Sequence, residues 1–247
     1  MDGHDEIVMT VATAQEIADG DICFVGVGVP SLAAMVAKRT SAPNARLVYE
    51  SGAIDSNPLR PPLSTGSPEV VERTAMLGRC LDVFAMLQAG RFELGLLSAA
   101  QVDRLGNLNS TAIGRYESPR LRLVGSGGAH DIASLARETV IIMPHDPRRF
   151  VEAVDFATSP GIQYRSASES PRLRGKGPRC IITPRARFDF SAGEMTLEAL
   201  FCGCTEDAAV AGFVWDVPRA KEIRQLASFS EAALTAAAEV CAATTDH

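Results

Sequence analysis

The sequence predicts an α/β domain with an open, mostly parallel sheet flanked by helices. Between residues 22 and 143, short apolar segments alternate with helical ones, and this strand–helix–strand order is typical of parallel sheets. Hydrophobic residues make up 46% and charged residues 22% of the 247 residues, as in ordinary globular domains. We therefore expect one domain over residues 1–247, with room for a substantial core.

Seven segments predict strands, because they are short, apolar and rich in β-branched or aromatic residues. In chain order these strands are residues 22–28, 46–49, 92–99, 120–124, 139–143, 180–183 and 187–190. The last two read as an antiparallel pair. Residues 53–75, rich in Pro and Ser, predict a long loop, which in a compact domain is often a lid or a substrate contact.

Five segments predict helices from their start and stop signals. A capping-box pattern begins at Thr13 and Gly20 follows as a C-cap, while Pro30 stands where the first turn of a helix tolerates proline. Gly90 closes an amphipathic segment, and the end of the chain is rich in alanine. In chain order the expected helices are residues 13–19, 31–38, 81–89, 132–137 and 221–243.

Charge and composition exclude several classes of function. The net charge of −6 argues against a nucleic-acid partner, which favours a basic surplus. No stretch has the roughly 18 uncharged apolar residues of a membrane helix, and the acidic start is unlike a secretory signal, so we expect a cytoplasmic protein without a membrane partner. The six cysteines form no paired Cys-x-x-Cys motif, and Cys202 and Cys204 have no histidine nearby in sequence, which predicts free thiols and no metal site.

Glu50 is the first candidate for chemistry. It follows the apolar residues Leu47, Val48 and Tyr49, and the small residues after it leave room for a substrate. A carboxylate at a partly apolar sheet edge is less hydrated and hence more nucleophilic. The alternative is that Glu50 is a solvated carboxylate at a strand end.

The glycine-rich loop at residues 125–129 is the second candidate. Glycines between a strand and a helix let backbone N–H groups face an oxyanion or a phosphate, and we expect Gly128 to need a positive φ. The alternative is a tight turn that merely requires glycine. The loop lacks the spacing of dinucleotide and P-loop motifs, and Ser126 misses the Gly-x-Ser-x-Gly elbow of serine hydrolases by one position.

Glu50, Gln101 and the glycine loop each follow a predicted strand end. Ligands of open α/β sheets bind just outside the carboxyl ends of the strands, and these three segments therefore predict a shared crevice. A basic stretch at residues 165–179 has two interpretations, a solvated connection or a patch for the phosphates of a ligand or for a partner chain.

Three motifs, taken in their order along the chain, resemble those of the β subunit of class I coenzyme A transferases, most closely the glutaconate type. Glu50-Ser51-Gly52 is similar to the family's Glu-(Asn/Ser)-Gly motif, and residues 125–131 to its Gly-x-Gly-Gly-Ala-x-Asp loop. Residues 101–109 resemble a third segment of the β half, and residues 148–161 a stretch of the glutaconate branch. The resemblance covers about residues 10–215.

The resemblance implies the α/β fold of the CoA-transferase type and a ping-pong transfer of coenzyme A from an acyl-CoA to a carboxylic acid. Glu50 would be the nucleophile and would carry a glutamyl-CoA thioester. Gly127, Gly128 and Ala129 would supply the oxyanion hole. Residues near the substrate or coenzyme A would be Ser51, Gly52, Gln101, Asn107, Asn109 and Ser126. No metal or redox cofactor is implied, since the coenzyme A thioester is itself a substrate.

Two alternatives stay open. The chain could be an acyl-CoA hydrolase, a ring-opening enzyme or a decarboxylase on the same fold, or a non-catalytic subunit that completes a partner's site. The presence of the glutamate favours transfer. The resemblance also implies an α subunit, because 247 residues leave no room for both halves, and a heterotetramer of two α and two β chains.

Overall fold

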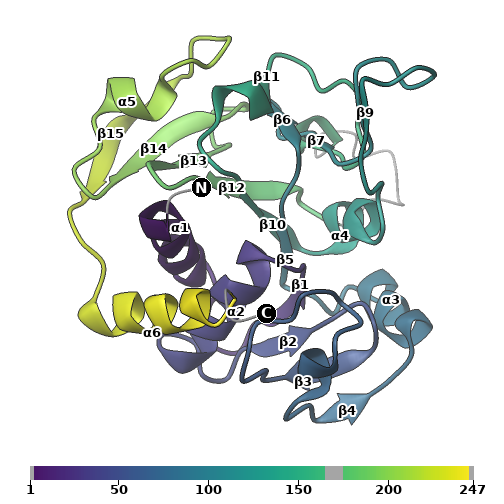
Figure 1. Cartoon of the computed structure of the whole chain (residues 1–247). Coiled ribbons are helices and arrows are strands. Elements are labelled where there is room, and N and C mark those ends of the chain that lie inside the picture. Colours follow the sequence, from purple (N-terminus) through teal and green to yellow (C-terminus); the bar gives the residue numbers. More distant parts are fainter. Residues whose placement is uncertain (1–2, 165–174, 245–247) are drawn as a thin grey trace. The chain divides into compact units, whose positions relative to one another are not determined.

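The computed structural model describes residues 3–164 and 175–244 (Figure 1). The chain forms two compact units, of which the first comprises the described residues up to Leu97 and from Ser228 onward, and the second comprises Ser98–Ala227. Each unit contains a sheet with helices, which confirms the α/β class. The prediction of one domain over residues 1–247 stays a prediction.

The sheet of the first unit has the strand order β5-β1-β2-β3-β4. The first three strands pair in parallel, and β3 and β4 extend them in antiparallel fashion. Strand β1 reads Ile-Cys-Phe-Val and its last three residues are buried, as a strand covered on both faces requires. The bounds are β1 Ile22–Val25, β2 Arg46–Val48, β3 Ala53–Ser56, β4 Met76–Leu77 and β5 Leu94–Leu97.

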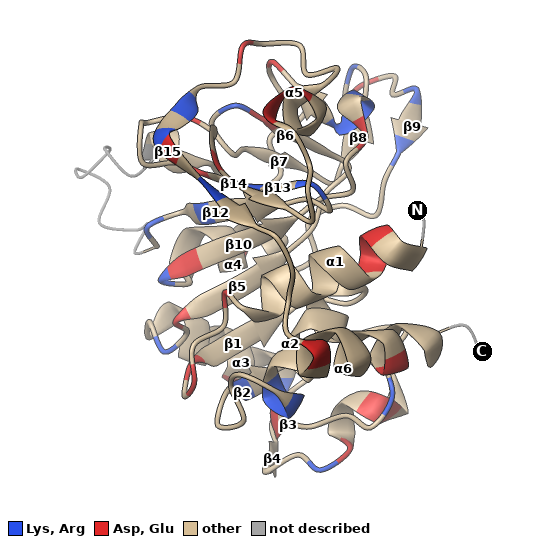
Figure 2. Cartoon of the chain, turned by 90° about the vertical axis from the view of Figure 1, so that its left-hand side faces the viewer, with Lys and Arg blue, Asp and Glu red and all other residues tan. Residues whose placement is uncertain are grey.

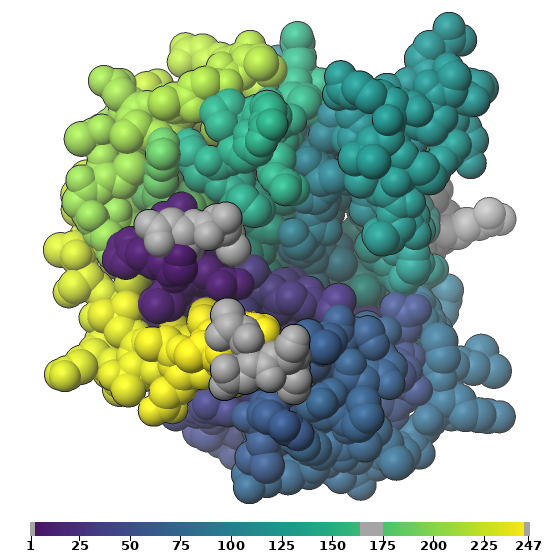
Figure 3. Space-filling model, in the orientation of Figure 1, coloured from purple at the N-terminus to yellow at the C-terminus, as the bar shows by residue number. Residues whose placement is uncertain are grey.

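Helices from both ends of the chain complete the first unit. Helices α1, α2 and α6 contact one another, and Figure 3 shows α1 in purple beside α6 in yellow. The first turn of α1 is acidic, and the last turn of α2 is basic, which suits the helix dipole (Figure 2). The bounds are α1 Gly3–Ala14, α2 Val29–Arg39, a 3-10 turn Pro68–Val71, α3 Cys80–Gln88 and α6 Glu231–Ala242.

The sheet of the second unit is mixed and has the order β15-β14-β13-β12-β10. Strands β10 and β12 pair in parallel, as do β14 and β15, whereas β12, β13 and β14 are antiparallel neighbours. Two small sheets, β11-β6-β7 and β8-β9, accompany it. The strands are β6 Gln101–Asp103, β7 Leu108–Asn109, β8 Ala112–Ile113, β9 Leu121–Arg122, β10 Glu138–Ile142, β11 Phe150–Val151, β12 Pro178–Ile182, β13 Ala186–Asp189, β14 Thr196–Phe201 and β15 Arg219–Leu226.

Short helices connect the strands of the second unit. Helix α4 spans Ala129–Leu135 and α5 spans Glu206–Val210, and 3-10 turns occupy Pro147–Arg149 and Ile162–Tyr164. The expected helix at residues 132–137 is therefore present but begins three residues earlier. Its start lies directly after the glycine loop, as the sequence predicts.

The predicted helix over residues 13–19 is wrong. Helix α1 ends at Ala14, and Thr13 lies in its last turn, where it is fully buried. Thr13 cannot cap a helix from that position. The capping pattern misleads because the buried face of α1 continues through Val8 and Val11 up to this residue.

Three further expectations need correction. The long loop at residues 53–75 contains strand β3 and a 3-10 turn, and residues 120–124 form only the exposed two-residue strand β9 of a separate hairpin. The expected helix at residues 221–243 is two elements, β15 and α6. Strand β15 is charged because it is largely exposed, and its pairing with β14 overrides the weak preference of its sequence.

No helix in the described part of the chain is long and apolar enough to cross a bilayer.

Candidate active site

Glu50 stands at the tip of the hairpin that joins β2 and β3. The Gly52 N–H donates to the Tyr49 carbonyl oxygen at 3.0 Å, and the Tyr49 N–H donates to the Ala53 carbonyl oxygen at 3.0 Å. Glu50 and Ser51 are therefore the two central residues of a tight turn. The prediction that Glu50 follows a strand end is confirmed.

Gly52 is required by this turn. Its φ of +113° belongs to the region that side chains avoid, and a Cβ at this position would collide with the carbonyl oxygen of Gly78. The Gly78 N–H also donates to the Gly52 carbonyl oxygen at 2.8 Å. The backbone conformation of the turn therefore requires glycine at position 52, apart from any room that this small residue leaves for a substrate.

The carboxylate of Glu50 is uncommitted. It is half-buried, and it makes no hydrogen bond or ion pair with any described residue. Other carboxylates of the same unit are engaged, since Asp55 pairs with Lys38 at 3.3 Å and Asp82 pairs with Arg79 at 3.0 Å. Glu50 is therefore free to act on a ligand.

A buried tyrosine supports the strand beneath Glu50. The hydroxyl groups of Tyr49 and Ser31 lie 3.0 Å apart, and both residues are fully buried. Burial raises the pKa of Tyr49 to about 12, so the phenol stays neutral and serves as a hydrogen-bonding group.

The glycine loop in the second unit turns through two left-handed residues. Gly125 has φ +92° and Gly127 has φ +46°, whereas Gly128 has φ −81°. The expectation of a positive φ at Gly128 is wrong, because Gly128 already has helical backbone angles as the N-cap of α4. The positions of this loop whose positive φ favours glycine are Gly125 and Gly127.

Two amides of this loop are available to a ligand. The Ala129 N–H donates to the Ser126 carbonyl oxygen at 2.8 Å, which commits it to the turn. The N–H groups of Gly127 and Gly128 have no hydrogen-bond partner among the described residues. Adjacent free amides ahead of a helix can bind a negatively charged oxygen.

The Ser126 hydroxyl is not arranged as a nucleophile with a histidine base. Ser126 Oγ accepts a hydrogen bond from the His130 backbone N–H at 3.3 Å. The His130 ring lies instead against the Thr158 carbonyl oxygen, with Nδ1 at 3.1 Å. This geometry disfavours the serine hydrolase interpretation.

Gln101 and Asn109 belong to one buried hydrogen-bond network. Gln101 Nε2 donates to Asp155 at 3.0 Å, and Asn109 Nδ2 donates to Gln101 Oε1 at 2.7 Å and to the Ala112 carbonyl oxygen at 2.7 Å. The two amides hold β6 to β7 and to the chain at Asp155. Gln101 follows the end of β5 at Leu97, as the sequence predicts, and is itself the first residue of β6.

Asn107 fixes the turn between β6 and β7. Its side-chain amide donates to Asp103 Oδ2 at 2.9 Å, and its Oδ1 accepts from the Gly161 N–H at 2.8 Å. Asp103 Oδ1 also accepts from the N–H groups of Leu105 and Asn107. This segment is a buried polar scaffold, and a role of Gln101, Asn107 and Asn109 beside the substrate stays a prediction.

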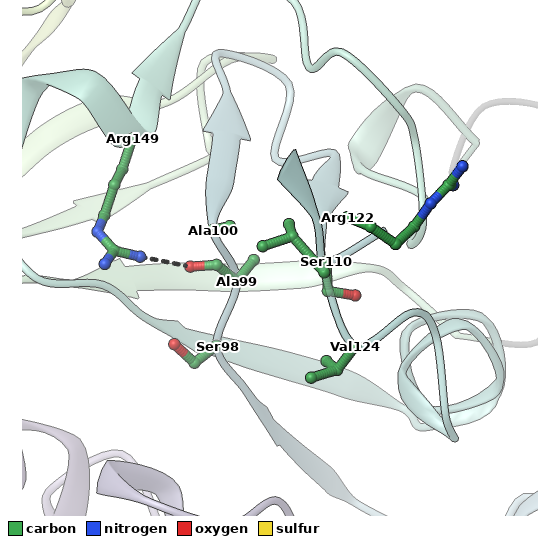
Figure 4. A pocket seen from close by; sticks show the side chains of 8 residues that line it. Ser98, Ala99, Ala100, Ser110, Arg122, Val124 and Arg149 are labelled. Atoms are coloured by element: carbon green, nitrogen blue, oxygen red, sulfur yellow. Dashed lines mark hydrogen bonds between the residues drawn. The ribbon is translucent and has the colours of Figure 1, made fainter. Parts of the chain in front are cut away.

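An arginine-bearing cavity lies next to the glycine loop, and the sequence analysis missed it (Figure 4). The cavity has a volume of about 600 Å³ and is lined by Ser98, Ala99, Ala100, Ser110, Arg122, Leu123, Val124 and Arg149. Ser110 Oγ donates to the Gly125 carbonyl oxygen at 2.8 Å, which ties the cavity wall to the loop. The adjacent arginines Arg148 and Arg149 are visible in the sequence as a positive charge. Their sequence neighbours do not indicate that a cavity lies beside them.

The remaining predictions concern basic and metal-binding residues. Residues 165–174 of the basic stretch lie outside the described residues, and residues 178–179 are part of β12 and not of a loop. Cys202 and Cys204 are free thiols. No group of three metal-ligating side chains occurs among the described residues, and the absence of a resident metal stays a prediction.

Glu50 belongs to the first unit, and Gln101 and the glycine loop belong to the second. Within the second unit, the loop, the network and the arginine cavity are neighbours. The prediction that all of them share one crevice with Glu50 stays a prediction.

Comparisons with known proteins place this arrangement in a family. The family described as Coenzyme A transferase matches residues 7–169. The B subunit of the 3-oxoadipate CoA-transferase of Pseudomonas knackmussii is 40% identical over 233 residues, 93% of this chain and 90% of the relative. The B subunit of the glutaconate CoA-transferase of Acidaminococcus fermentans is 33% identical over 227 residues, 87% of this chain and 85% of the relative.

A solved structure agrees with these relatives. The crystal structure of glutaconate coenzyme A-transferase from Acidaminococcus fermentans superposes with a TM-score of 0.87 at 29% identity, covering 96% of this chain and 94% of the other. The match extends over nearly the whole α/β fold, which confirms the resemblance inferred from the three motifs. The two relatives above are both named as B subunits, and the chain belongs to the coenzyme A transferase family.

Proposed function

We propose that this chain is the glutamate-bearing β subunit of a CoA-transferase that moves coenzyme A from an acyl-CoA to a carboxylic acid. The observation that carries the proposal is the half-buried carboxylate of Glu50 at a hairpin tip, unpaired among the described residues, in a chain of this family. A carboxylate free of internal partners is available as a nucleophile toward a thioester carbonyl.

The proposed reaction has two symmetrical halves. A Glu50 oxygen attacks the thioester carbonyl, the C–S bond breaks, and the coenzyme A thiolate leaves behind an acyl-glutamyl anhydride. The thiolate then attacks the glutamyl carbonyl and releases the first acid, which leaves a glutamyl-CoA thioester. The carboxylate of the second acid attacks that thioester, and the same steps run in reverse to give the new acyl-CoA and free Glu50.

The glycine loop is proposed to stabilise the tetrahedral intermediates. The free N–H groups of Gly127 and Gly128 are the donors we assign to the oxyanion, while Ala129 acts through the turn that it closes. Water must be excluded from the site, since it would hydrolyse the anhydride. The scheme uses only carboxylates, carbonyls and a thiolate, so we expect no resident cofactor.

We also propose a partner and a substrate class. The relatives are named as B subunits, which supports an α subunit that works with this chain, and we propose two copies of each chain in the complex. Two of the relatives are named for 3-oxoadipate and glutaconate, which are both dicarboxylic acids. We propose that this enzyme also acts on a dicarboxylic acyl group.

The test is to trap the thioester on Glu50. The αβ complex is incubated with an acyl-CoA without acceptor, and the peptide that contains Glu50 is searched for the added mass of coenzyme A. Glu50→Gln is expected to abolish the adduct and to lower the transfer rate by about 10⁴-fold or more, since the amide is a poor nucleophile. An adduct on another residue, or a tenth of the activity in Glu50→Gln, would contradict the proposal.

The same experiment separates transfer from hydrolysis. Wild-type complex that releases thiol from acyl-CoA equally fast with and without an acceptor acid would be a hydrolase. If the αβ complex that carries Glu50→Gln transferred coenzyme A at the wild-type rate, this chain would be a non-catalytic subunit.

A further inference from the structure

Arg149 differs from its neighbour Arg148 in having no carboxylate partner among the described residues. Arg148 is exposed and makes a two-point contact with Asp146, with distances of 2.7 and 3.0 Å. Arg149 is half-buried, and the only side-chain hydrogen bond that it makes in the described part of the chain runs from one terminal nitrogen to the Ala99 carbonyl oxygen at 3.2 Å (Figure 4). A guanidinium has five N–H donors, so most of those of Arg149 remain unused.

The cavity around Arg149 suits a short chain that ends in an anion. Its walls are Ala99, Ala100, Leu123 and Val124, with two serines, and none of the described residues that line it is acidic. Arg122, the second arginine of the lining, points its guanidinium away from the other lining residues (Figure 4), donates to the Tyr116 carbonyl oxygen and lies 4.8 Å from the centre of the Tyr116 ring. Arg149 is thus a positive charge at a largely apolar cavity, and it forms no ion pair with any described residue.

A second cavity of about 450 Å³ adjoins the first and shares Ala100, Leu123 and Arg149 with it. Asp146 lines this second cavity, but its carboxylate is already bound by Arg148, which together with Arg149 holds its pKa at about 2. Asp146 therefore stays charged, and its carboxylate is hydrogen-bonded by the side chain of Arg148 and not by that of Arg149.

We propose that Arg149 binds the far carboxylate of the dicarboxylic acyl group, the end opposite to the carbon that carries coenzyme A. This inference rests on the proposed function and adds the residue that selects the substrate class. A planar guanidinium can bind a carboxylate through two parallel hydrogen bonds, which gives orientation as well as affinity.

The position of the cavity favours this carboxylate over a phosphate of coenzyme A. Ser110 and Val124 line the cavity, and they contact or adjoin Gly125 at the start of the glycine loop. The far carboxylate of a short diacid lies only a few bonds from the thioester carbonyl, whereas the pantetheine arm separates that carbonyl from the phosphates by a much longer chain. An anion site directly beside the loop matches the shorter distance.

The experiment compares two acids of equal chain length, glutarate and pentanoate, which differ only in the far carboxylate. Their binding to the αβ complex is measured by calorimetry, and their use as acceptors is measured with acetyl-CoA as donor. For Arg149→Met we expect binding and kcat/KM for glutarate to fall about ten- to a hundredfold, and those for pentanoate to change less than threefold.

Two further variants control for structure and charge. Arg104→Met removes an exposed arginine of the same unit that lines neither cavity, and it is expected to leave the ratio of glutarate to pentanoate unchanged. Arg149→Lys keeps the charge but loses the two-point contact, and it is expected to recover part of that ratio. Should Arg149→Met unfold, Arg149→Lys and the preference of the wild type for glutarate still decide the proposal.

Several results would overturn the inference. Equal binding of glutarate and pentanoate by the wild type would remove the carboxylate site. Equal losses for both acids in Arg149→Met, with weaker binding of coenzyme A itself, would assign Arg149 to a phosphate of coenzyme A. Both results leave the proposed function intact as long as the wild-type complex transfers coenzyme A. Failure of the proposed function would appear differently, as binding of the acids without any transfer.

Discussion

At the scale of single residues, the position of Glu50 depends on the glycine that follows Ser51. We expect Gly52→Ala to destabilise the protein and to displace the hairpin tip, because Ala would adopt φ +113° with a Cβ against the Gly78 backbone. Gly20→Ala is the matched control, since Gly20 has φ +91° with open space around it.

Urea unfolding measures the difference between these two variants. Gly20→Ala should lose about 1–2 kcal/mol from the left-handed backbone alone, and Gly52→Ala about 1–3 kcal/mol more from the collision. Equal losses in the two variants would show that the Gly78 backbone moves aside without cost.

We expect His145 to make the stability of the protein depend on pH. Its ring is stacked with Phe213 at 5.5 Å, and neither ring nitrogen has a hydrogen-bond partner among the described residues. Burial, and next the charge of Arg185, lower the pKa of His145 to about 4, against the opposing effect of Asp146. The unfolded chain takes up this proton near pH 6.5, so folding stability falls as the pH drops from 6.5 to about 4.

The variant His145→Phe is expected to remove this dependence and to keep the ring contacts. Because the ring is only partly buried, we expect the pH-dependent loss to be about 1–2 kcal/mol in the wild type. Unfolding free energies at pH 7, 5.5 and 4.5 measure it. Parallel pH profiles of the two proteins would refute the assignment to His145.

Local sequence suffices for residues whose role follows from their neighbours. The position of Glu50 at a turn could be predicted because an apolar strand precedes it and a turn glycine comes two residues later, and its role stays a prediction. Arg149 could not, because its cavity is built by residues 98–100, 110 and 122–124, which the fold alone brings together. The engaged amide of Ala129 also depends on three-dimensional geometry, and the sequence therefore did not separate it from Gly127 and Gly128.

At the scale of elements, the stability of α6 depends on Ser230, the residue that caps its start. Ser230 Oγ accepts a hydrogen bond from the Ala233 N–H at 3.3 Å, and so caps the helix. We expect Ser230→Ala to lower the free energy of unfolding by about 0.5–2 kcal/mol. Ser228→Ala serves as control, since Ser228 is exposed and has no hydrogen bond among the described residues, and a loss of the same size there would argue against the cap.

The apolar strands could be predicted, and the polar ones could not. Strands β1, β2, β5 and β10 carry enough buried aliphatic residues to stand out in the sequence. Strand β15 is polar and mostly exposed, so only its pairing with β14 reveals it. Strand β3 is likewise hidden in the segment 53–75 rich in Pro and Ser, and β4 directly follows that segment; pairing with neighbouring backbone and not a side-chain pattern defines both strands.

At the scale of the whole molecule, we predict that the chain does not work alone. The purified chain is expected to show less than about a hundredth of the CoA-transfer activity that it shows with its α subunit, since the family relatives are subunits of a larger enzyme. Initial rates with several acyl-CoA donors and carboxylate acceptors, with and without the α chain, measure this. Full activity of the isolated chain would require a homo-oligomeric enzyme instead.

The family and the need for a partner could be predicted from three short motifs in order, and the matching residues 7–169 contain all of them. The two-unit organisation could not be predicted, because the last helix returns to the first unit after the entire second unit. Contacts between segments so distant in sequence leave no local pattern.

That return of α6 has a consequence for biosynthesis. Helices α1 and α2 rest against α6, yet α6 leaves the ribosome only after residues 98–227 have been made. The apolar surface of α1 and α2 that α6 covers therefore stays exposed, or bound by a chaperone, while more than half of the chain is translated. The second unit, by contrast, is one continuous stretch of chain. All of its residues have therefore been synthesised before the first unit receives its last helix.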